Sequence, residues 1–463
     1  MVLLDSPQTA ALSSLLTSPV DLDSRSPNQQ LLPLTACLND RDHLEIGGCD
    51  VVDLVAQFGS PLYILDEQTL RVGAQQYQQA MQRYYPGSAQ VIYASKAWNC
   101  LATCAIVTSE GFGIDVASGG ELYTALQAGV SGEKIYFHGN NKSLPELEFA
   151  IAAGCTVVAD NWLELERLAE LAPASGNSPR VMLRITPGIE CHTHEYIRTG
   201  HLDSKFGFDP NQISALLDFA VQHSQVNWVG FHAHIGSQIF ELQPHQDLAG
   251  VLADWLAAAI AAGLPMNELN VGGGLGIRYV ESDQPPSITD WVKVVAESIA
   301  AACQDRGLPL PKLICEPGRS LIGPACVTAY TIGGHKEVPG IRTYVAVDGG
   351  MSDNPRPITY QSAYRAVVGN RMAAPVSQTV TVAGKHCESG DILLKDAQLP
   401  VTEPGDILVV MTTGAYNYSM ASNYNRLTRP AAVLVHSGEA NLILKRETYQ
   451  DLVKNDLLPE RLV

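Results

Sequence analysis

The feature that most constrains the fold of this chain is a series of eight short apolar runs, each ending in polar or glycine residues. Stretches long enough for a helix separate the runs, and several begin with a capping residue, such as Ser143 with Glu146 three positions later. Runs that are apolar throughout are typical of parallel strands buried on both faces. Eight successive strand–helix alternations therefore predict a closed, TIM-like (β/α)8 barrel over residues 65–325. The runs are VIYASKA (91–97), GIDVASG (113–119), IYFHGN (135–140), TVVAD (156–160), VMLRITPG (181–188), WVGFHAHIGSQ (228–238), LNVGGG (269–274) and KLICEPGRS (312–320).

The polar residues that close these runs indicate an enzyme. In a (β/α)8 barrel the active site lies at the carboxyl ends of the strands. Chemically useful side chains at so many strand ends are unlikely to be a coincidence. The ends carry Lys96, Ser118, His138, Asp160, Arg184, His234, three glycines and Glu316.

The rest of the chain predicts a second domain. After Ser320, short β-branched runs separated by Gly, Pro and Asp follow one another without helices, which predicts an antiparallel β domain over residues 326–463. Residues 43–64 are expected to form a segment that packs with this domain. Residues 1–42 are rich in small polar residues and are expected to be a mobile extension, with a cleaved targeting segment as the alternative.

Composition excludes several classes of partner. The net charge of −18 argues against nucleic acid or an anionic membrane surface as the main partner. No apolar run reaches the roughly 18 residues that a membrane span needs, and no basic residue precedes Arg25, so a secretory signal is not expected. The ten cysteines are scattered and include no CxxC pair, which favours free thiols in the cytoplasm.

Lys96 is a candidate nucleophile because it closes a strand of small and apolar residues. A lysine in a barrel mouth is costly to desolvate, so its pKa should fall, and a desolvated lysine forms Schiff bases. The alternative is a lysine that reaches out to the solvent at the rim.

The glycines Gly272, Gly273 and Gly274 follow a strand, where their backbone amides could approach a phosphate closely. Ser237 and the backbone around Gly318 could supply further donors. The spacing is not that of a dinucleotide fingerprint, and an ordinary glycine turn remains the alternative.

Glu316 and His234 extend the predicted cofactor site. A carboxylate in a barrel mouth needs a cationic partner, such as a protonated ring nitrogen, or otherwise Arg319 or Lys96. His234 could stack on a flat ring. His232 and the residues 191–195 (CHTHE) raise a metal site as a rival, but they lack zinc-ligand spacing and no metal is expected. A Schiff-base lysine, a phosphate cradle and a ring-nitrogen partner together predict pyridoxal 5′-phosphate.

Residues of the β domain predict the part of the substrate that is recognised. Arg356 could bind a carboxylate through two hydrogen bonds, and Glu388 suits an ammonium group. Both together favour a substrate whose far end is itself an amino acid. Tyr360 and Tyr416 are further candidates. Cys387 could donate a proton, with a small buried thiol as the alternative.

From about residue 43 onward the chain resembles the diaminopimelate decarboxylases. These are fold-type III pyridoxal-phosphate enzymes related to ornithine decarboxylases and, in the barrel, to alanine racemase. Single motifs such as GGGLG would not be specific, but the ordered set is. The motifs are YASKA (93–97), DVASGGEL (115–122), FHGNNKS (137–143), HTHEYIRTGHLDSKFG (192–207), GFHAHIGSQ (230–238), NVGGGLGI (270–277), CEPGRS (315–320), DNPRPITY (353–360), CESGD (387–391), and YN followed by RP (424–430).

The resemblance implies decarboxylation of meso-2,6-diaminopimelate to L-lysine in a homodimer with shared active sites, to which Cys387 and Glu388 come from the partner subunit. It implies that Lys96 forms the Schiff base, that Glu316 pairs with the pyridine nitrogen and that Cys387 reprotonates the product carbon. His234 is expected to stack on the ring. The remaining expected contacts are Ser237, Gly272, Gly273, Gly274, Glu316, Pro317, Gly318 and Arg319 around the phosphate, Arg319, Arg356, Tyr360 and Glu388 on the substrate, and Tyr416 on both.

Three other functions stay open at this point. Another basic amino-acid or carboxynorspermidine decarboxylase shares the cofactor chemistry, although Arg356 together with Glu388 disfavours plain-amine substrates. An amino-acid racemase has a similar barrel but typically uses a tyrosine as its acid–base partner. A non-catalytic cofactor-binding homologue is disfavoured because Lys96, Glu316 and Cys387 are all present.

Overall fold

The computed structural model describes residues 25–172, 178–189 and 203–462. The chain divides into two compact units. One unit comprises Arg71–Ile277 and Gln284–Leu321, and the other comprises Met1–Leu70, Arg278–Asp283 and Ile322–Val463. None of the described helices is long and apolar enough to cross a membrane.

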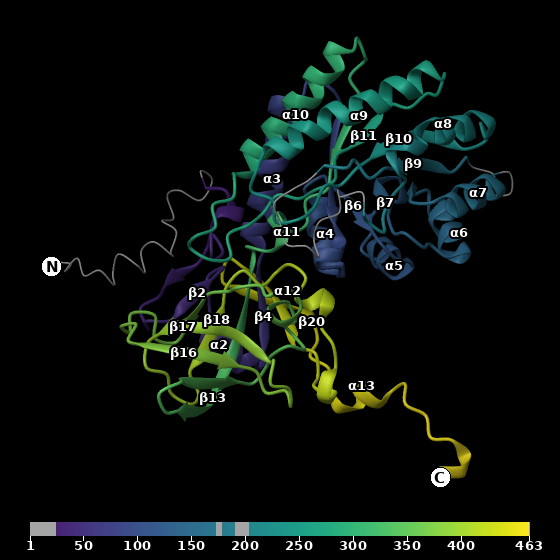
Figure 1. The fold of residues 1–463 in the computed structure, drawn as a ribbon. Helices are drawn as coiled ribbons and strands as arrows, with labels where there is room; N and C mark the ends of the chain where they lie inside the picture. The colour runs from purple at the N-terminus through teal and green to yellow at the C-terminus, as the bar shows by residue number, and fades with distance from the viewer. Residues whose placement is uncertain (1–24, 173–177, 190–202, 463) are drawn as a thin grey trace. The chain divides into compact units, whose positions relative to one another are not determined.

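The first unit is built on a closed barrel of eight parallel strands, which confirms the predicted barrel. Each strand lies within or overlaps one of the apolar runs, and helices lie around the outside of the strands (Figure 1). The strands are β5 (Ala89–Ala94), β6 (Gly113–Val116), β7 (Ile135–Phe137), β8 (Thr156–Ala159), β9 (Arg180–Arg184), β10 (Asn227–His232), β11 (Glu268–Asn270) and β12 (Lys312–Cys315). The helices are α3 (Glu67–Tyr84), α4 (Leu101–Ser109), α5 (Gly119–Gln127), α6 (Leu144–Ala153), α7 (Trp162–Leu171), α8 (Ile213–Gln222), α9 (Gln243–Ala261), α10 (Ile288–Asp305) and α11 (Arg319–Ile322).

Local sequence explains both the strands and the helix starts. Inside the barrel a layer of buried side chains is contributed by six strands, as expected for a packed barrel interior. The helix α6 begins with the predicted capping box, in which Ser143 and Glu146 satisfy backbone amides reciprocally. The side chains of Asn161 and Ser118 cap α7 and α5 by accepting from the backbone amides of Glu164 and Glu121. The layer consists of Ile92, Tyr136, Val158, Met182, Val229 and Ile314.

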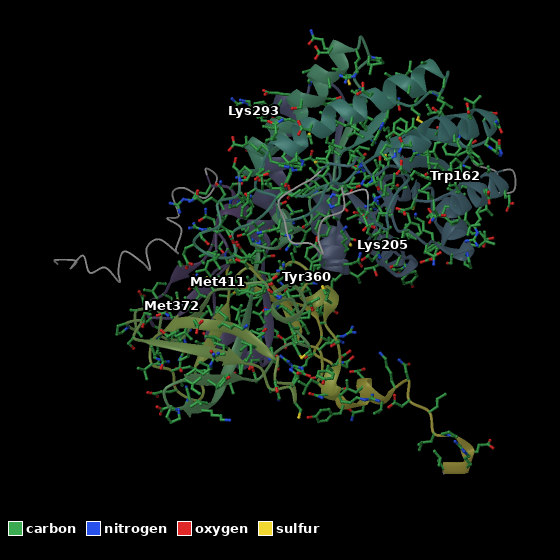
Figure 2. The ribbon with its side chains drawn as sticks, viewed as in Figure 1. Trp162, Lys205, Lys293, Tyr360, Met372 and Met411 are labelled. Atoms are coloured by element: carbon green, nitrogen blue, oxygen red, sulfur yellow. The ribbon has the colours of Figure 1, made fainter. Side chains whose placement is uncertain are left out.

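The second unit contains a mostly antiparallel sheet in the order β17-β16-β14-β13-β4-β19-β20, with β18 also paired to β13 and β15 paired to β18. Two pairs, β14 with β16 and β4 with β19, are parallel, which the sequence did not predict. Met372 and Met411 (Figure 2) pack in the core beneath this sheet. The strands are β4 (Leu62–Asp66), β13 (Cys326–Val338), β14 (Arg342–Val347), β15 (Ala366–Val368), β16 (Gln378–Ala383), β17 (Ile392–Leu399), β18 (Ile407–Val410), β19 (Ala431–His436) and β20 (Glu439–Leu444).

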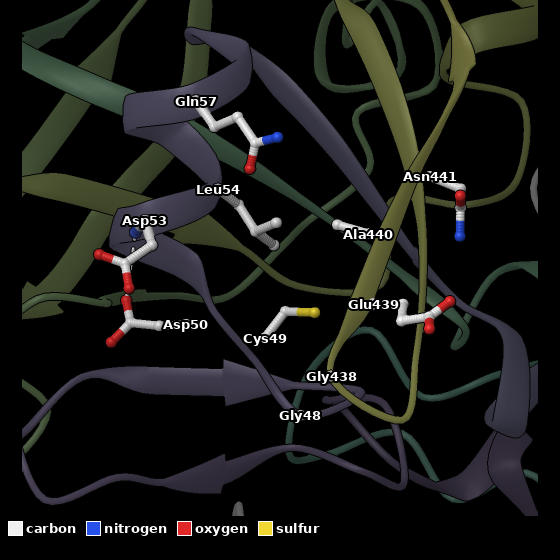
Figure 3. A pocket seen from close by; sticks show the side chains of 10 residues that line it. All are labelled: Gly48, Cys49, Asp50, Asp53, Leu54, Gln57, Gly438, Glu439, Ala440 and Asn441. Carbon is white, nitrogen blue, oxygen red and sulfur yellow. Dashed lines mark hydrogen bonds between the residues drawn. The ribbon is translucent and has the colours of Figure 1, made fainter.

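Short elements complete this unit. A three-stranded sheet precedes the helix α2 and supports one side of the core. A polar pocket of about 520 Å³, lined by residues of α2 and β20 among others, contains none of the predicted site residues (Figure 3). The short elements are β1 (Cys37–Leu38), β2 (Leu44–Ile46), β3 (Cys49–Asp50), α2 (Val51–Phe58), α12 (Arg356–Tyr360) and α13 (Tyr449–Val453).

The expectation of a mobile extension through residue 42 is wrong for the described part of that segment. Leu31, Leu32 and Leu34 are 5%, 1% and 1% exposed, and the first two belong to the core of the second unit. The backbone is also anchored, because Thr412 donates to the Leu31 carbonyl oxygen and the Leu34 amide donates to the Thr69 hydroxyl. The segment packs in the core because the short apolar run LLPL (31–34) lies within its otherwise polar sequence. Residues 1–24 lie outside the described residues.

Candidate active site

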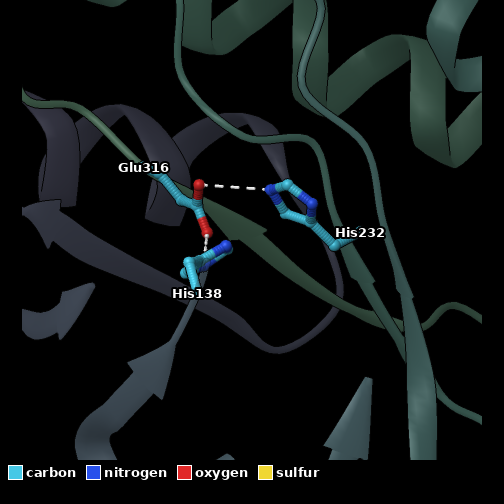
Figure 4. A group of neighbouring side chains, drawn as sticks. All are labelled: His138, His232 and Glu316. Carbon is cyan, nitrogen blue, oxygen red and sulfur yellow. Dashed lines mark hydrogen bonds and ion pairs between the residues drawn. The ribbon is translucent and has the colours of Figure 1, made fainter. Parts of the chain in front are cut away.

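At the carboxyl edge of the barrel, the carboxylate of Glu316 is the centre of a buried polar cluster (Figure 4). Asn270 Nδ2 donates to Glu316 Oε1 over 2.7 Å. His138 Nε2 lies 2.9 Å from Oε1, and His232 Nε2 lies 3.3 Å from Oε2. The alternative that Glu316 pairs with Arg319 or Lys96 is therefore not what the structure shows.

The ionisation of this cluster follows from burial and from these contacts. Burial by itself would raise the pKa of Glu316, but His138 and His232 outweigh it and hold the pKa well below its ordinary range. Burial lowers the pKa of His232 to about 3, so this ring is neutral near pH 7. The cluster therefore presents an ionised carboxylate beside a neutral imidazole. Ligand atoms of the three side chains lie within 4.8 Å of one another, a spacing that a metal ion could bridge, and both imidazoles are in direct contact with the carboxylate.

The glycine turn after β11 is connected to this cluster. A Cβ on Gly273 would lie 2.3 Å from the Glu316 carbonyl oxygen, so only glycine allows the two backbones to approach this closely. The Gly272 amide donates to Asn270 Oδ1, and the Gly273 amide donates to His234 Nδ1. Two of the three predicted phosphate donors are thus engaged inside the protein, and their contact with a phosphate stays a prediction.

His234 is half-buried just beyond the end of β10. Burial, with the positive charge of Lys96 next in importance, lowers the pKa of His234 well below its ordinary value. A neutral ring agrees with the hydrogen bond in which Nδ1 accepts from Gly273. An uncharged imidazole is suited to stacking on a flat ring.

Lys96 lies in a single 3-10 turn directly after β5, at the same barrel edge. Its charge acts on both His234 and Asp115, which places the ammonium near the cluster. Lys96 is exposed, and the expected desolvation of its amine stays a prediction.

Arg319, at the start of α11, completes the barrel side of the site. Its guanidinium donates from Nε and Nη2 to the Ser237 hydroxyl over 3.1 and 3.0 Å. The preceding Pro317 accepts at its carbonyl oxygen from the Ala94 amide, which fixes this turn to the end of β5. A Cβ on Gly318 would lie 3.0 Å from that of Ala94. A buried guanidinium next to a hydroxyl group is suited to bind an anionic group such as phosphate.

In the second unit, Arg356 is a buried cation surrounded by tyrosines. Its Nη1 donates to the hydroxyls of Tyr279 and Tyr364 over 2.8 and 2.6 Å, and its guanidinium lies 6.0 Å from the Tyr360 ring centre. Among the described residues no carboxylate lies within ion-pair distance of it. Tyr416 has φ of 66°, a left-handed conformation that is costly for a tyrosine and frequent at functional sites.

Cys387 and Glu388 are exposed on the segment before β17. The Cys387 amide donates to Asn425 Oδ1 over 2.9 Å, so the backbone is held while the thiol faces outward. This exposure contradicts the alternative of a buried structural thiol. Residues 190–202, which include the CHTHE run (191–195) and most of the motif at 192–207, lie outside the described residues.

Comparison with known proteins identifies the family of this chain. Residues 71–323 match the family described as pyridoxal-dependent decarboxylase, pyridoxal binding domain. The chain is 64% identical over 459 residues to a diaminopimelate decarboxylase from Synechocystis, with 97% of each chain covered. The chain belongs to the diaminopimelate decarboxylase family. A diaminopimelate decarboxylase from Bacillus subtilis is 47% identical over 91% of this chain and 97% of its own length.

A solved structure of this family, the enzyme from M. jannaschii in complex with L-lysine, has a TM-score of 0.87. It is 33% identical and covers 95% of this chain and 100% of its own. The family assigned from the sequence motifs is thus confirmed, and so is the pyridoxal cofactor class. The residues at the barrel edge fit pyridoxal phosphate, because they offer an amine, an ionised carboxylate, and a cation paired with a hydroxyl.

Sequence reasoning did not find the partners of Glu316. His138 and Asn270 both stand in motifs at strand ends, but the sequence does not predict that either contacts Glu316. The available signal was that Asn270 is a polar residue ending the otherwise apolar strand β11 beside glycines. Asp160 and Arg184, also noted without a role, lie 3.8 Å apart at neighbouring strand ends.

Proposed function

We propose that this chain decarboxylates meso-2,6-diaminopimelate to L-lysine and CO2, the last step of lysine biosynthesis, with pyridoxal 5′-phosphate as cofactor. The observation that carries this proposal is the 64% identity, along nearly the whole chain, with a protein named diaminopimelate decarboxylase. Arg356 supports it independently, since a buried cation that has no anionic partner among the described residues is suited to a substrate carboxylate.

The cofactor would be held by residues of the barrel. Lys96 supplies the amine for covalent attachment, and His234 supplies a neutral ring for stacking. Arg319, Ser237 and the glycine turn would surround the phosphate. When bound, pyridoxal phosphate supplies an electron sink for the electrons released as the carboxylate leaves.

In the proposed reaction, the polar cluster around Glu316 would control the protonation of the cofactor ring. The ionised Glu316 would keep a proton on the pyridine nitrogen, and Asn270, His138 and His232 orient its carboxylate for that contact. A buried carboxylate that is already ionised needs no proton transfer before it can do so. Cys387 would then deliver a proton to the carbon that has lost CO2.

Recognition of the far end of the substrate would fall to Arg356 and Glu388. The guanidinium is already positioned by two tyrosine hydroxyls, so little side-chain entropy is lost when it binds a carboxylate. Glu388 would pair with the distal ammonium group. Tyr360 and Tyr416 would complete the contacts.

Replacing Arg356 by alanine is expected to raise KM for diaminopimelate by roughly 30-fold or more, because a charged hydrogen-bond partner is lost in a buried setting. Inhibition by 1,5-diaminopentane, which has the distal ammonium group but no carboxylate, should change far less. Arg342→Ala, a change at an exposed arginine on β14, is the matched control and should leave both values unchanged. An equal loss of affinity for diaminopimelate and for 1,5-diaminopentane would contradict the assigned role.

We also infer a homodimer with shared active sites and a cytoplasmic location. The outward-facing Cys387 and Glu388 support the first, since both are available to a second subunit. The nine described cysteines are free thiols, which supports the second.

The test is CO2 release by the purified protein loaded with pyridoxal phosphate. The substrates are meso-diaminopimelate, its L,L isomer, L-lysine, L-ornithine and L-arginine. Release from the meso compound alone, with stoichiometric L-lysine, is expected. Release from another substrate would favour a related basic amino-acid or carboxynorspermidine decarboxylase. No release from any would favour an amino-acid racemase or a non-catalytic cofactor-binding homologue.

A further inference from the structure

The C-terminal arm, defined as residues 449–462, is an apolar segment that its own unit does not cover. It begins with α13 and then runs away from the sheet of the second unit (Figure 1). Leu457 and Leu458 are 90% and 75% exposed, and Tyr449, Val453 and Leu462 are each more than half exposed. Single exposed apolar residues are ordinary, whereas a cluster of them marks an interaction surface. The arm is therefore a candidate docking segment.

The base of the arm is fixed to its unit by hydrogen bonds. Asn423 Nδ2 donates to Glu447 Oε2 over 2.5 Å, just before the arm begins. Arg426 donates to the Leu452 carbonyl oxygen over 2.5 Å and to Asp456 Oδ2 over 2.8 Å. Beyond these contacts, residues 457–462 hydrogen-bond only to one another within the part of the chain that the structure describes. The base is thus held in place, while the apolar end is left for another partner.

The base of the arm lies beside the turn that carries Cys387. Asn425, directly before Arg426, accepts the hydrogen bond from the Cys387 amide over 2.9 Å. Arg426 itself has φ of 56°, a left-handed conformation that is costly for an arginine and persists where the surroundings impose it. In the proposed homodimer, Cys387 and Glu388 serve the active site of the partner subunit. A subunit close enough to receive them therefore also reaches the base of the arm.

The barrel carries an apolar surface that is suited to such an arm. Leu101 and Leu144 are the first residues of α4 and α6, Leu163 is the second residue of α7, and these leucines are 54%, 42% and 50% exposed. Tyr123 of the intervening α5 is 58% exposed, and successive helices of this series contact one another. Each helix follows its strand, so its start lies at the carboxyl edge of the barrel, where the candidate active site is. We call these four residues the apolar rim.

The length of the arm matches the length of the apolar rim. The arm has five helical residues and nine more, and can extend at most about 40 Å. Packed helices lie about 8–10 Å apart, so the starts of four successive helices span about 30 Å. A second copy of this chain is the occupant that fits, because the dimer that brings Cys387 to a barrel edge brings the base of the arm to that same edge.

We propose that the C-terminal arm of one subunit docks on the apolar rim of the partner's barrel. The inference rests on the proposed homodimer with shared active sites, and not on the identity of the substrate. Docking removes both apolar surfaces from water, which stabilises the association of the two subunits. It also holds the turn of Cys387 against the barrel that it serves.

The direct test places a photo-cross-linking residue, benzoylphenylalanine, at position 458 of the full-length protein loaded with pyridoxal phosphate. Irradiation is expected to give a covalent dimer on a denaturing gel, with the cross-link mapped to residues 101–163. Benzoylphenylalanine at position 341, an apolar site that is 72% exposed between β13 and β14, is the matched control and should not cross-link to that range. A cross-link at position 458 that stays within one chain, maps elsewhere or does not form overturns the proposal.

A second measurement uses the double variant Leu457→Ser and Leu458→Ser. Burial of one leucine side chain is worth about tenfold or more in affinity, so subunits are expected to exchange between tagged and untagged dimers roughly 100-fold faster. Ile341→Ser should leave the exchange rate unchanged. An exchange rate of the double variant equal to that of the wild type overturns the proposal.

The wild-type protein separates failure of the arm from failure of the homodimer. Sedimentation as a monomer at every concentration would contradict the homodimer and the docking together. A wild-type dimer whose arm neither cross-links to 101–163 nor slows exchange would contradict the docking alone. CO2 release from diaminopimelate tests the proposed reaction independently of both.

Discussion

Replacing Lys96 by alanine is expected to abolish nearly all CO2 release from diaminopimelate. The substitution removes the amine placed after β5 at the barrel edge, and without it the cofactor can be held only non-covalently. A barrier increase of only about 4 kcal/mol already slows a reaction roughly 1000-fold. The measurements are the rate of CO2 release and the covalent retention of cofactor after borohydride reduction.

The matched control is Lys293→Ala, a change at an exposed lysine on α10 (Figure 2). It should keep both full activity and covalent labelling by the reduced cofactor. Substantial activity in the Lys96 variant, or covalent labelling that persists without Lys96, would contradict the assignment of this lysine.

Replacing Cys387 by alanine is expected to lower kcat with little change in KM. A general acid typically contributes about 10²- to 10⁴-fold, and the exposed thiol is not needed to hold the segment, because the backbone amide makes the contact with Asn425. Steady-state kinetics measure both constants. Cys37→Ala, at a partly exposed cysteine of β1, is the control and should leave kcat unchanged.

The Cys387→Ala variant also tests whether each active site is shared between two subunits. Lys96→Ala and Cys387→Ala proteins are each expected to be nearly inactive, but mixed subunits should regain part of the activity if the thiol reaches the partner's lysine. In the kinetics of the Cys387→Ala protein alone, a large rise in KM with unchanged kcat would instead mean that Cys387 only shapes the pocket. Mixed subunits that stay inactive would contradict sharing.

The candidate site could be predicted in part because parallel strands impose their own geometry. All eight strands of the barrel end on one edge, so polar residues at those ends meet regardless of their spacing along the chain. This is why Lys96, His234, Glu316 and Arg319 could be placed together from sequence. The partners of Glu316 were missed, because which side chain turns toward a given carboxylate depends on rotamers and packing within the barrel.

The second unit was harder to predict because its contacts are distant in sequence. The strand β4 at residues 62–66 pairs in parallel with β19 at residues 431–435, and nothing in either run identifies the other. The LLPL run near the N-terminus becomes core only because this sheet lies against it.

By itself the sequence determined the barrel, the edge on which its chemistry lies and the family of the chain. These follow from local rules, since apolar periodicity, caps and ordered motifs act over a few residues at a time. Only the tertiary structure decided the hydrogen-bond partners of Glu316 and the tyrosine surroundings of Arg356. Most of those contacts join residues tens of positions apart, and their energies arise only when folding removes the groups from water.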